Sequence, residues 1–367
     1  MVGACDRCLR RTWLLARLSG YLEHHRRRIE ELLAESDEAL VESVRRALGR
    51  RGEEASLERE YAAYGLARAR VDRERAAAAG LELLCRCEAD YPGRLRRLKA
   101  PPAVLHVAGG VARLLALTRE PPVAVVGSRR AGAYGLEVAH DLARGISASG
   151  LSVVSGMAAG VDAAAHRGAL AAGGRTVAVL PACAATAYPR ANASLHRRIL
   201  ERGVAVSELG PGAQLRRWSL VSRNRVVASL SELVVVVQAG EHSGALLTAA
   251  LARASGVGVG AVPGAVGSAL SAGPHELIRE GATLIRDARD ALEVVLGPGA
   301  PETTLGPRAT LRPEQARLLE AIRAGADTAP ALARELGEEQ SLLASLAELE
   351  LAGCLRRFPG GRYVAMA

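Results

Sequence analysis

The stretch VAVVGSRRAGAYGLEVAHDLARGISASGLSVVSGMAAGVDAAAH, residues 123–166, decides the fold. Its apolar run Val123–Val126 stops at the turn GSR (127–129), and a helical pattern follows. A second apolar run, Leu151–Val154, stops at the turn SGMAAG (155–160) before another helical pattern. Two successive strands of a βαβ unit therefore bring glycine-rich turns to the same edge of a sheet. Glycine allows close backbone approach, and a helix start offers free N–H groups, so this edge suits a phosphate.

Charge supports the same interpretation. The 367 residues carry a formal charge of +9 with a sequence pI of about 9.7, which favours a polyanionic partner. Segment 122–295 has 17 arginines against 12 acidic residues, whereas segment 306–367 has eight of each. Arg129 and Arg130 place two of these positive charges directly at the first glycine turn.

Continuous apolar runs predict strands that are buried on both faces, as in a mostly parallel, doubly wound sheet. Helical patterns lie between most of them, so the fold class is α/β. The runs occur at 123–126, 151–154, 176–180, 204–207, 233–237, 257–262 and 282–285.

The chain divides into four predicted parts. Residues 1–80, rich in Ala, Leu, Arg and Glu, predict a helical domain, and 81–296 predict an extended Rossmann-like domain. Prolines and glycines mark a linker at 297–310. The tail, 311–367, predicts three helices (313–324, 329–336 and 338–351) and a hairpin (355–365), which is the order of a winged helix.

Several further groups are candidates for function. Arg223-Asn224-Arg225 suits phosphate oxygens and base edges, and Ser243-Gly244 follows a later strand at the same edge. Arg175 precedes the run 176–180, so a parallel sheet places it at the opposite edge. Asp162 and His166 are four residues apart on one helix face, but no nucleophile accompanies them, so structural roles are favoured over acid–base catalysis.

Cysteine usage leaves one alternative open. Cys5-x-x-Cys8 and Cys85-x-Cys87 could supply four zinc thiolates, but the second spacing is atypical and the two pairs are far apart. Ordinary thiols are therefore the favoured interpretation, and no metal or cofactor is expected. No apolar run approaches the roughly 20 residues of a membrane span, so a cytoplasmic protein is expected.

Residues from about 90 to 290 resemble the DNA-processing protein A family (DprA, also called Smf). The resemblance rests on many motifs in the same order: VGSR (126–129), SGMAAGVDAAAH (155–166), GGRTVAVL (173–180), Tyr188-Pro189, SELGPG (207–212), RNRVVASL (223–230), SGALLTA (243–249), Pro263-Gly264 and HELIREGA (275–282).

This resemblance implies a non-enzymatic homodimer that binds single-stranded DNA and loads the RecA recombinase in natural transformation. It assigns a DNA contact to Arg129 and a second basic contact to Arg175. The residues expected at the DNA are Gly127, Ser128, Arg129, Arg130, Ser155, Gly156, Gly160, Arg175, Arg223, Asn224, Arg225, Ser243 and Gly244.

The chain departs from the family pattern at three places. Leu220 replaces a phenylalanine, which affects base stacking, and Gln238 replaces an acidic residue. Gly273-Pro274-His275 replaces a glycine-threonine-asparagine motif. The last two changes cast doubt on acid chemistry at residue 238 and leave DNA binding intact.

Two rival functions remain. Related Rossmann-like folds cleave nucleotide N-glycosidic bonds with a glycine-rich segment followed by a glutamate, and release of free base would favour that class. The nearest segment here, 263–267, has no such glutamate. A winged-helix transcription factor is the other rival. It is disfavoured because the third helix of the tail carries four glutamates and no arginine or lysine.

Overall fold

The protein is described by a computed structural model that covers residues 4–48, 53–299, 312–336, 339–351, 354–358 and 361–365. Contacts divide the chain into two compact units, Met1–Thr303 and Thr304–Ala367. Each unit is described by itself. Among the described helices, none is both long and apolar enough to cross a membrane.

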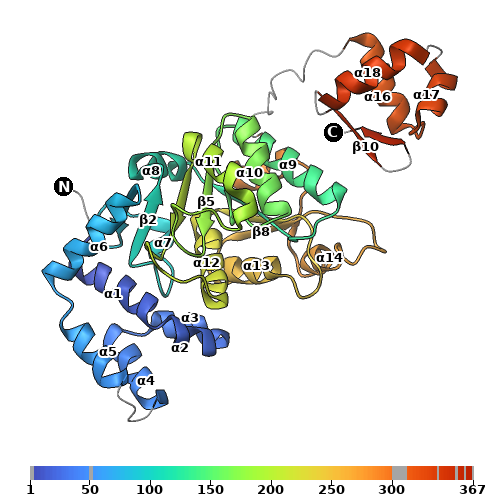
Figure 1. Cartoon of the computed structure of the whole chain (residues 1–367). Helices are drawn as coiled ribbons and strands as arrows, with labels where there is room; N and C mark the ends of the chain where they lie inside the picture. Colours follow the sequence, from blue (N-terminus) through green and yellow to red (C-terminus); the bar gives the residue numbers. More distant parts are fainter. Residues whose placement is uncertain are drawn as a thin grey trace. The chain divides into compact units, whose positions relative to one another are not determined.

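The first unit is built on one large sheet (Figure 1). Its strand order within the described residues is β1-β2-β6-β5-β4-β3-β7-β8-β9. Strands β3 to β9 are parallel, while β2 pairs antiparallel with both β1 and β6. The strands are β1 Leu81–Cys85, β2 Val104–Ala108, β3 Val123–Val126, β4 Val153–Ser155, β5 Thr176–Leu180, β6 Val204–Ser207, β7 Leu233–Val236, β8 Gly258–Ala261 and β9 Thr283–Leu284. A mixed α/β fold with a mostly parallel sheet is therefore confirmed.

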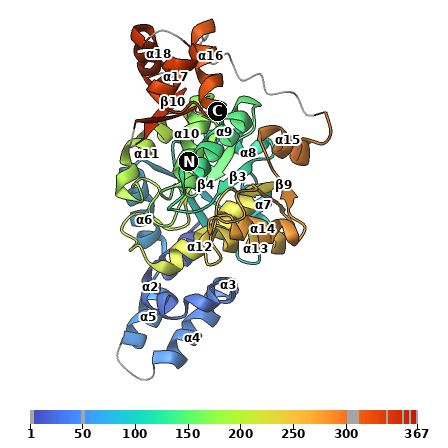
Figure 2. The ribbon, with the colours of Figure 1, turned by 90° about the vertical axis from the view of Figure 1, so that its right-hand side faces the viewer.

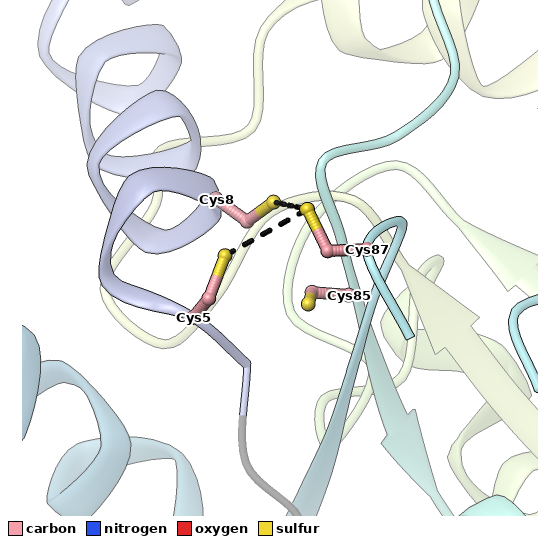
Figure 3. Close-up of side chains that lie close together, drawn as sticks. All are labelled: Cys5, Cys8, Cys85 and Cys87. Atoms are coloured by element: carbon pink, nitrogen blue, oxygen red, sulfur yellow. Dashed lines mark hydrogen bonds between the residues drawn. The ribbon is translucent and has the colours of Figure 1, made fainter. Parts of the chain in front are cut away.

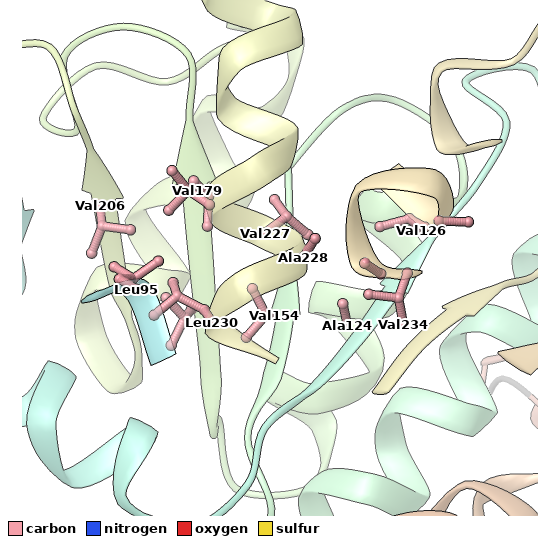
Figure 4. Packing of buried hydrophobic residues seen from close by; sticks show 14 of the residues in the cluster. Leu95, Ala124, Val126, Val154, Val179, Val206, Val227, Ala228, Leu230 and Val234 are labelled. Carbon is pink, nitrogen blue, oxygen red and sulfur yellow. The ribbon is translucent and has the colours of Figure 1, made fainter. Parts of the chain in front are cut away.

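Helices cover both faces of this sheet because successive strand residues point to opposite sides. Ala124 and Val126 face one buried cluster, and Val123 and Val125 face the other. Figure 4 shows the first cluster, in which Val227 and Leu230 of α12 pack against the strands. The helices are α7 Gly93–Arg96, α8 Val111–Arg119, α9 Ala133–Ala148, α10 Val161–Ala171, α11 Ala193–Arg202, α12 Arg217–Leu230, α13 Gly244–Ala254, α14 Ala272–Arg279 and α15 Ala288–Leu296.

The N-terminal segment is helical, as predicted, and its helices lie beside α12 (Figure 2). Its buried residues form a common core with residues of α12. Leu14, Leu22 and Leu40 form one buried cluster with Trp218 of α12. The Trp218 indole is fully buried and donates to Ser19 Oγ at 3.0 Å. Helices α1 to α5 thus pack over α12. The segment contains α1 Asp6–Arg17, α2 Ser19–His24, α3 Ile29–Ala34, α4 Asp37–Leu48, α5 Glu53–Ala62 and α6 Leu66–Ala78.

The second unit contains three helices and an antiparallel hairpin in its described residues. They are α16 Pro313–Arg323, α17 Ala329–Leu336, α18 Glu339–Leu351, β10 Leu355–Phe358 and β11 Arg362–Ala365. Leu346 and Leu349 of α18 are buried in the unit's own core, whereas Leu343 is 57% exposed. Most of the predicted linker and the hairpin residues 359–360 lie outside the described residues.

Candidate nucleic-acid interface

The candidate site lies where the strand order reverses. Strand β3 pairs with β4 on one side and with β7 on the other. The chain leaves β3 for α9, which packs on one face, and leaves β7 for α13, which packs on the opposite face. The helices that follow these two strands therefore lie on opposite faces of the sheet, which opens a crevice at the carboxyl ends of the strands. A cleft of about 570 Å³ lies at this point.

Two glycines bring the loops after β3, β4 and β7 into backbone contact. A Cβ at Gly127 would lie 2.8 Å from the carbonyl oxygen of Gln238, and a Cβ at Gly160 would lie 2.2 Å from that of Ser128. Gly160 also has a φ of +81°, which favours glycine. In the space so left, Ser128 N donates to Gln238 O at 2.6 Å and Val161 N donates to Ser128 O at 3.2 Å. The three loops form one connected rim.

Gln238 holds this rim in place. Its Oε1 accepts a hydrogen bond from Gly132 N at 3.0 Å, and its side chain is buried against α9. A Cβ at Gly135 would lie 2.2 Å from the same oxygen. The absence of a side chain at Gly135 therefore lets α9 pack closely against Gln238. The residue that replaces the expected acid is therefore a neutral support for the loop after β3.

The exposed positive charge of the cleft comes from Arg129 and Arg130, which project from the loop after β3. Ser128 Oγ accepts from Arg130 N at 3.1 Å and so fixes the turn. Helix α13 begins at the cleft, where Ser243 Oγ accepts from Ala245 N at 3.3 Å. The start of α13 adds a positive dipole end to the two guanidinium groups.

Nine of the 13 residues predicted from the sequence line the cleft together. They are Gly127, Ser128, Arg129, Arg130, Gly156, Arg223, Asn224, Ser243 and Gly244. Gly160 does not line it but shapes its rim, as described above.

Arg223 is 8% exposed and supports the cleft from below. Its Nη1 donates to the carbonyl oxygen of Val179 at 2.7 Å and to that of Gly156. A Cβ at Gly156 would lie 1.9 Å from the same nitrogen, so this glycine makes room for the guanidinium. Asp162 is buried nearby. Burial raises the pKa of Asp162 and lowers that of Arg223, while the attraction between the two groups opposes both shifts.

The structure contradicts the predicted DNA contacts at Arg225 and Ser155. The Arg225 side chain is 1% exposed, and its guanidinium binds Glu208, with 2.6 Å between Nη2 and Oε2, and the carbonyl oxygen of Ala100. Ser155 is fully buried and donates to Val125 O at 2.7 Å. Both side chains are buried and bonded to other protein groups, so neither faces a DNA strand.

Arg175 lies outside the cleft. It directly precedes β5, at the edge of the parallel sheet opposite the cleft, where the sequence places it. Its side chain is half-buried. A DNA strand in the cleft would have to pass around the sheet to reach Arg175. The second contact at Arg175 therefore rests on the resemblance alone and stays a prediction.

Asp162 and His166 do not form an acid–base pair. His166 Nδ1 lies 2.7 Å from Thr176 Oγ1, and burial lowers the pKa of this imidazole to about 3, so it is neutral. Asp162 Oδ2 accepts from Ala158 N at 3.3 Å beside the start of α10. Both residues have the structural roles that the sequence favoured.

Sequence reasoning missed Glu241 and His242, and it did not include Leu220 and Leu247 among the residues expected at the DNA. All four line the cleft. The loop after β7 was the available signal, because a turn at the same sheet edge as the GSR turn belongs to the same crevice. Glu241 adds a negative charge to the cleft, while Leu220 and Leu247 add apolar contact area.

The fold and the cleft define an α/β protein with a glycine-lined, arginine-bearing crevice at the point of strand reversal. A family model described as DNA recombination-mediator protein A matches residues 82–296. The chain belongs to this family of recombination mediators, which is not a family of enzymes.

Relatives support the assignment. The DNA-processing protein DprA of Mycobacterium tuberculosis, named as putative, is 49% identical over 172 residues, 47% of this chain and 44% of that protein. The matched part thus spans less than half of that relative. Protein Smf of Escherichia coli is 33% identical over 285 residues, 74% of each chain.

Two solved structures are similar. DNA processing protein A from Streptococcus pneumoniae has a TM-score of 0.62 at 29% identity, covering 79% of this chain and 98% of that one. The protein from Helicobacter pylori, whose structure concerns its single-stranded DNA binding mode, has a TM-score of 0.53 at 28% identity. It covers 59% of this chain and 97% of the other.

The rim geometry makes Gly160 a sensitive position. We expect Gly160→Ala to lower the free energy of unfolding of the first unit by about 1–3 kcal/mol from backbone strain, with the clash at Ser128 added to it. Gly150→Ala is the matched control, because Gly150 has a φ of +85° but open space around its Cβ position. Urea unfolding followed by the fluorescence of Trp13 and Trp218, both in the first unit, measures the difference. Equal losses in the two variants would contradict the contact between the loops.

Proposed function

We propose that this protein binds single-stranded DNA in the cleft at the strand reversal. The proposal rests on one observation: three features surround the same cleft. They are the loops that Gly127 and Gly160 bring together, the exposed Arg129 and Arg130, and the start of α13. Phosphate oxygens accept from backbone N–H groups and from guanidinium groups, so a nucleic acid backbone fits this donor set. The family and the single-stranded DNA binding of the H. pylori relative support the same ligand.

The contacts proposed are mainly to phosphates. Aromatic residues make up 3% of the chain, and Trp218 of α12 is buried under the N-terminal helices. Leu220 in the cleft offers an apolar surface without the face of an aromatic ring. Stacking then contributes little, and the affinity depends weakly on base identity.

The remaining proposals follow from the family. We propose that the protein acts as a homodimer in the cytoplasm, protects incoming single strands and transfers them to the RecA recombinase during natural transformation. The description of the family as a recombination mediator supports transfer to a recombinase. None of these steps needs a cofactor.

For the second unit we propose a winged-helix fold that is not the principal DNA reader. Three helices followed by a hairpin support the fold. Glu348 and Glu350 on α18 are exposed, and Glu348 pairs with Arg312. In the hairpin, Arg362 Nε lies 3.0 Å from Asp327 Oδ2. The side chains of Gln340, Ser341, Arg356 and Arg357 lie outside the described residues.

Arg129→Ala tests the cleft directly. We expect it to weaken single-stranded DNA binding by about 1–3 kcal/mol, because it removes a charge-assisted phosphate contact. The matched control is Arg119→Ala, which removes the same charge from the exposed end of α8, at the opposite edge of the sheet. Fluorescence anisotropy with a labelled oligonucleotide measures both variants. An equal small effect in both would remove Arg129 from the site.

Salt dependence tests the phosphate contribution. If about three phosphates are contacted, affinity falls on the order of tenfold between roughly 50 and 200 mM salt, and Arg129→Ala lowers the slope by about 0.7. Oligo-dT and oligo-dA of equal length then bind alike at fixed salt. Salt-independent binding, or strong preference for one homopolymer, would indicate a base-specific pocket.

Removal of the second unit tests its role. We expect a chain ending at Gly297 to keep most of its single-stranded DNA affinity, because the cleft lies wholly within residues 126–270. The full chain and the isolated second unit are compared by gel shift with single-stranded and duplex oligonucleotides. If the truncated chain does not bind while the isolated unit binds duplex tightly, the transcription-factor alternative is favoured.

A further inference from the structure

Four cysteines that are far apart in the sequence meet in the fold. Cys5 directly precedes α1 and Cys8 lies in its first turn, while Cys85 ends β1 and Cys87 lies in the turn that follows (Figure 3). All four sulfur atoms lie within 4.8 Å of one another. The long gap between the pairs, which spoke against a metal site in the sequence, is closed by the packing of α1 and α6 beside the sheet edge.

The sulfur distances suit one tetrahedral ion. Cys8 Sγ lies 3.6 Å and Cys5 Sγ lies 3.9 Å from Cys87 Sγ. With a zinc–sulfur bond of about 2.3 Å, a regular tetrahedron places its sulfurs about 3.8 Å apart. A disulfide needs about 2.05 Å between the two sulfurs, which none of these distances approaches. The space holds a single ion and not a cluster with its own sulfides.

We propose that Cys5, Cys8, Cys85 and Cys87 bind one structural zinc ion. Four thiolate ligands are the set that zinc prefers in closed, non-catalytic sites, because they leave no position for water or substrate. Four thiolates around Zn²⁺ carry a net charge of −2. Arg7 is well placed to offset it, since its Nη2 donates to Cys87 Sγ at 3.5 Å.

The ion would fasten the N-terminal helices to the sheet. Two of its ligands belong to the start of α1 and two to the end of β1, so the metal bonds cross from one element to the other. Beside it, Arg73 Nη2 of α6 donates to Ala4 O at 2.9 Å and pairs with Asp6, which joins α6 to the start of α1. Zinc binding would therefore be coupled to the folding of the helical cover over α12.

Metal content of the purified full chain tests the proposal. We expect about one zinc ion per chain by mass spectrometry of the metal, and loss of most of it in Cys8→Ser and Cys87→Ser. Cys183→Ser is the matched control, because Cys183 lies outside the cluster. Cys87→His keeps the ion, since histidine replaces a thiolate in many zinc sites. Arg7→Ala weakens zinc affinity roughly tenfold.

A second measurement keeps the proposal testable if the serine variants fold poorly. The full chain, freed of metal under reducing conditions, is titrated with Co²⁺, and we expect the strong visible absorption of tetrahedral thiolate coordination at about one equivalent. Zinc then displaces it. Absence of this band, bound iron in place of zinc, or a disulfide within the cluster in the freshly purified chain would overturn the proposal. None of these measurements depends on DNA binding, so the two proposals fail independently.

Discussion

The structure depends on the absence of two side chains at the strand reversal. Without a Cβ at Gly127 and Gly160, the loops after β3, β4 and β7 approach to hydrogen-bonding distance of one another. Their contacts with one another are backbone to backbone, and the buried Gln238 side chain supports the loop after β3. This rigidity leaves Arg129 and Arg130 on a fixed turn, which lowers the entropy lost when a phosphate is bound.

Beneath the rim, buried charges support the cleft instead of facing the ligand. Arg223 binds the carbonyl oxygen of Gly156 and that of Val179, and Arg225 pairs with Glu208. A buried charge without a partner is costly, and each of these arginines has carbonyl or carboxylate oxygens around it. The two arginines of the RNR motif therefore support the cleft by positioning the segments around it. They hold α12 against the loop after β4 and against Ala100 and Glu208.

Much of the fold could be predicted because buried parallel strands have a strong signature. Each predicted core run contains or overlaps an observed strand, and the glycine turns meet at one edge as expected. Arg225 and Ser155 were misassigned because sequence does not show which side of α12 or β4 faces inward. The burial of Trp218 likewise depends on a hydrogen-bond partner nearly 200 positions away. The meeting of the four cysteines also depends on tertiary contacts that no local pattern encodes.

The central claim is that a single strand of DNA lies in the cleft at the strand reversal. Hydrogen exchange of backbone amides in the full chain, with and without an oligonucleotide, tests it most directly. We expect single-stranded DNA to slow exchange at residues 127–132, 156–160 and 240–246, and duplex DNA at the same concentration to do so far less. Protection confined to the second unit, or to residues around Arg175 at the opposite edge of the sheet, would contradict it.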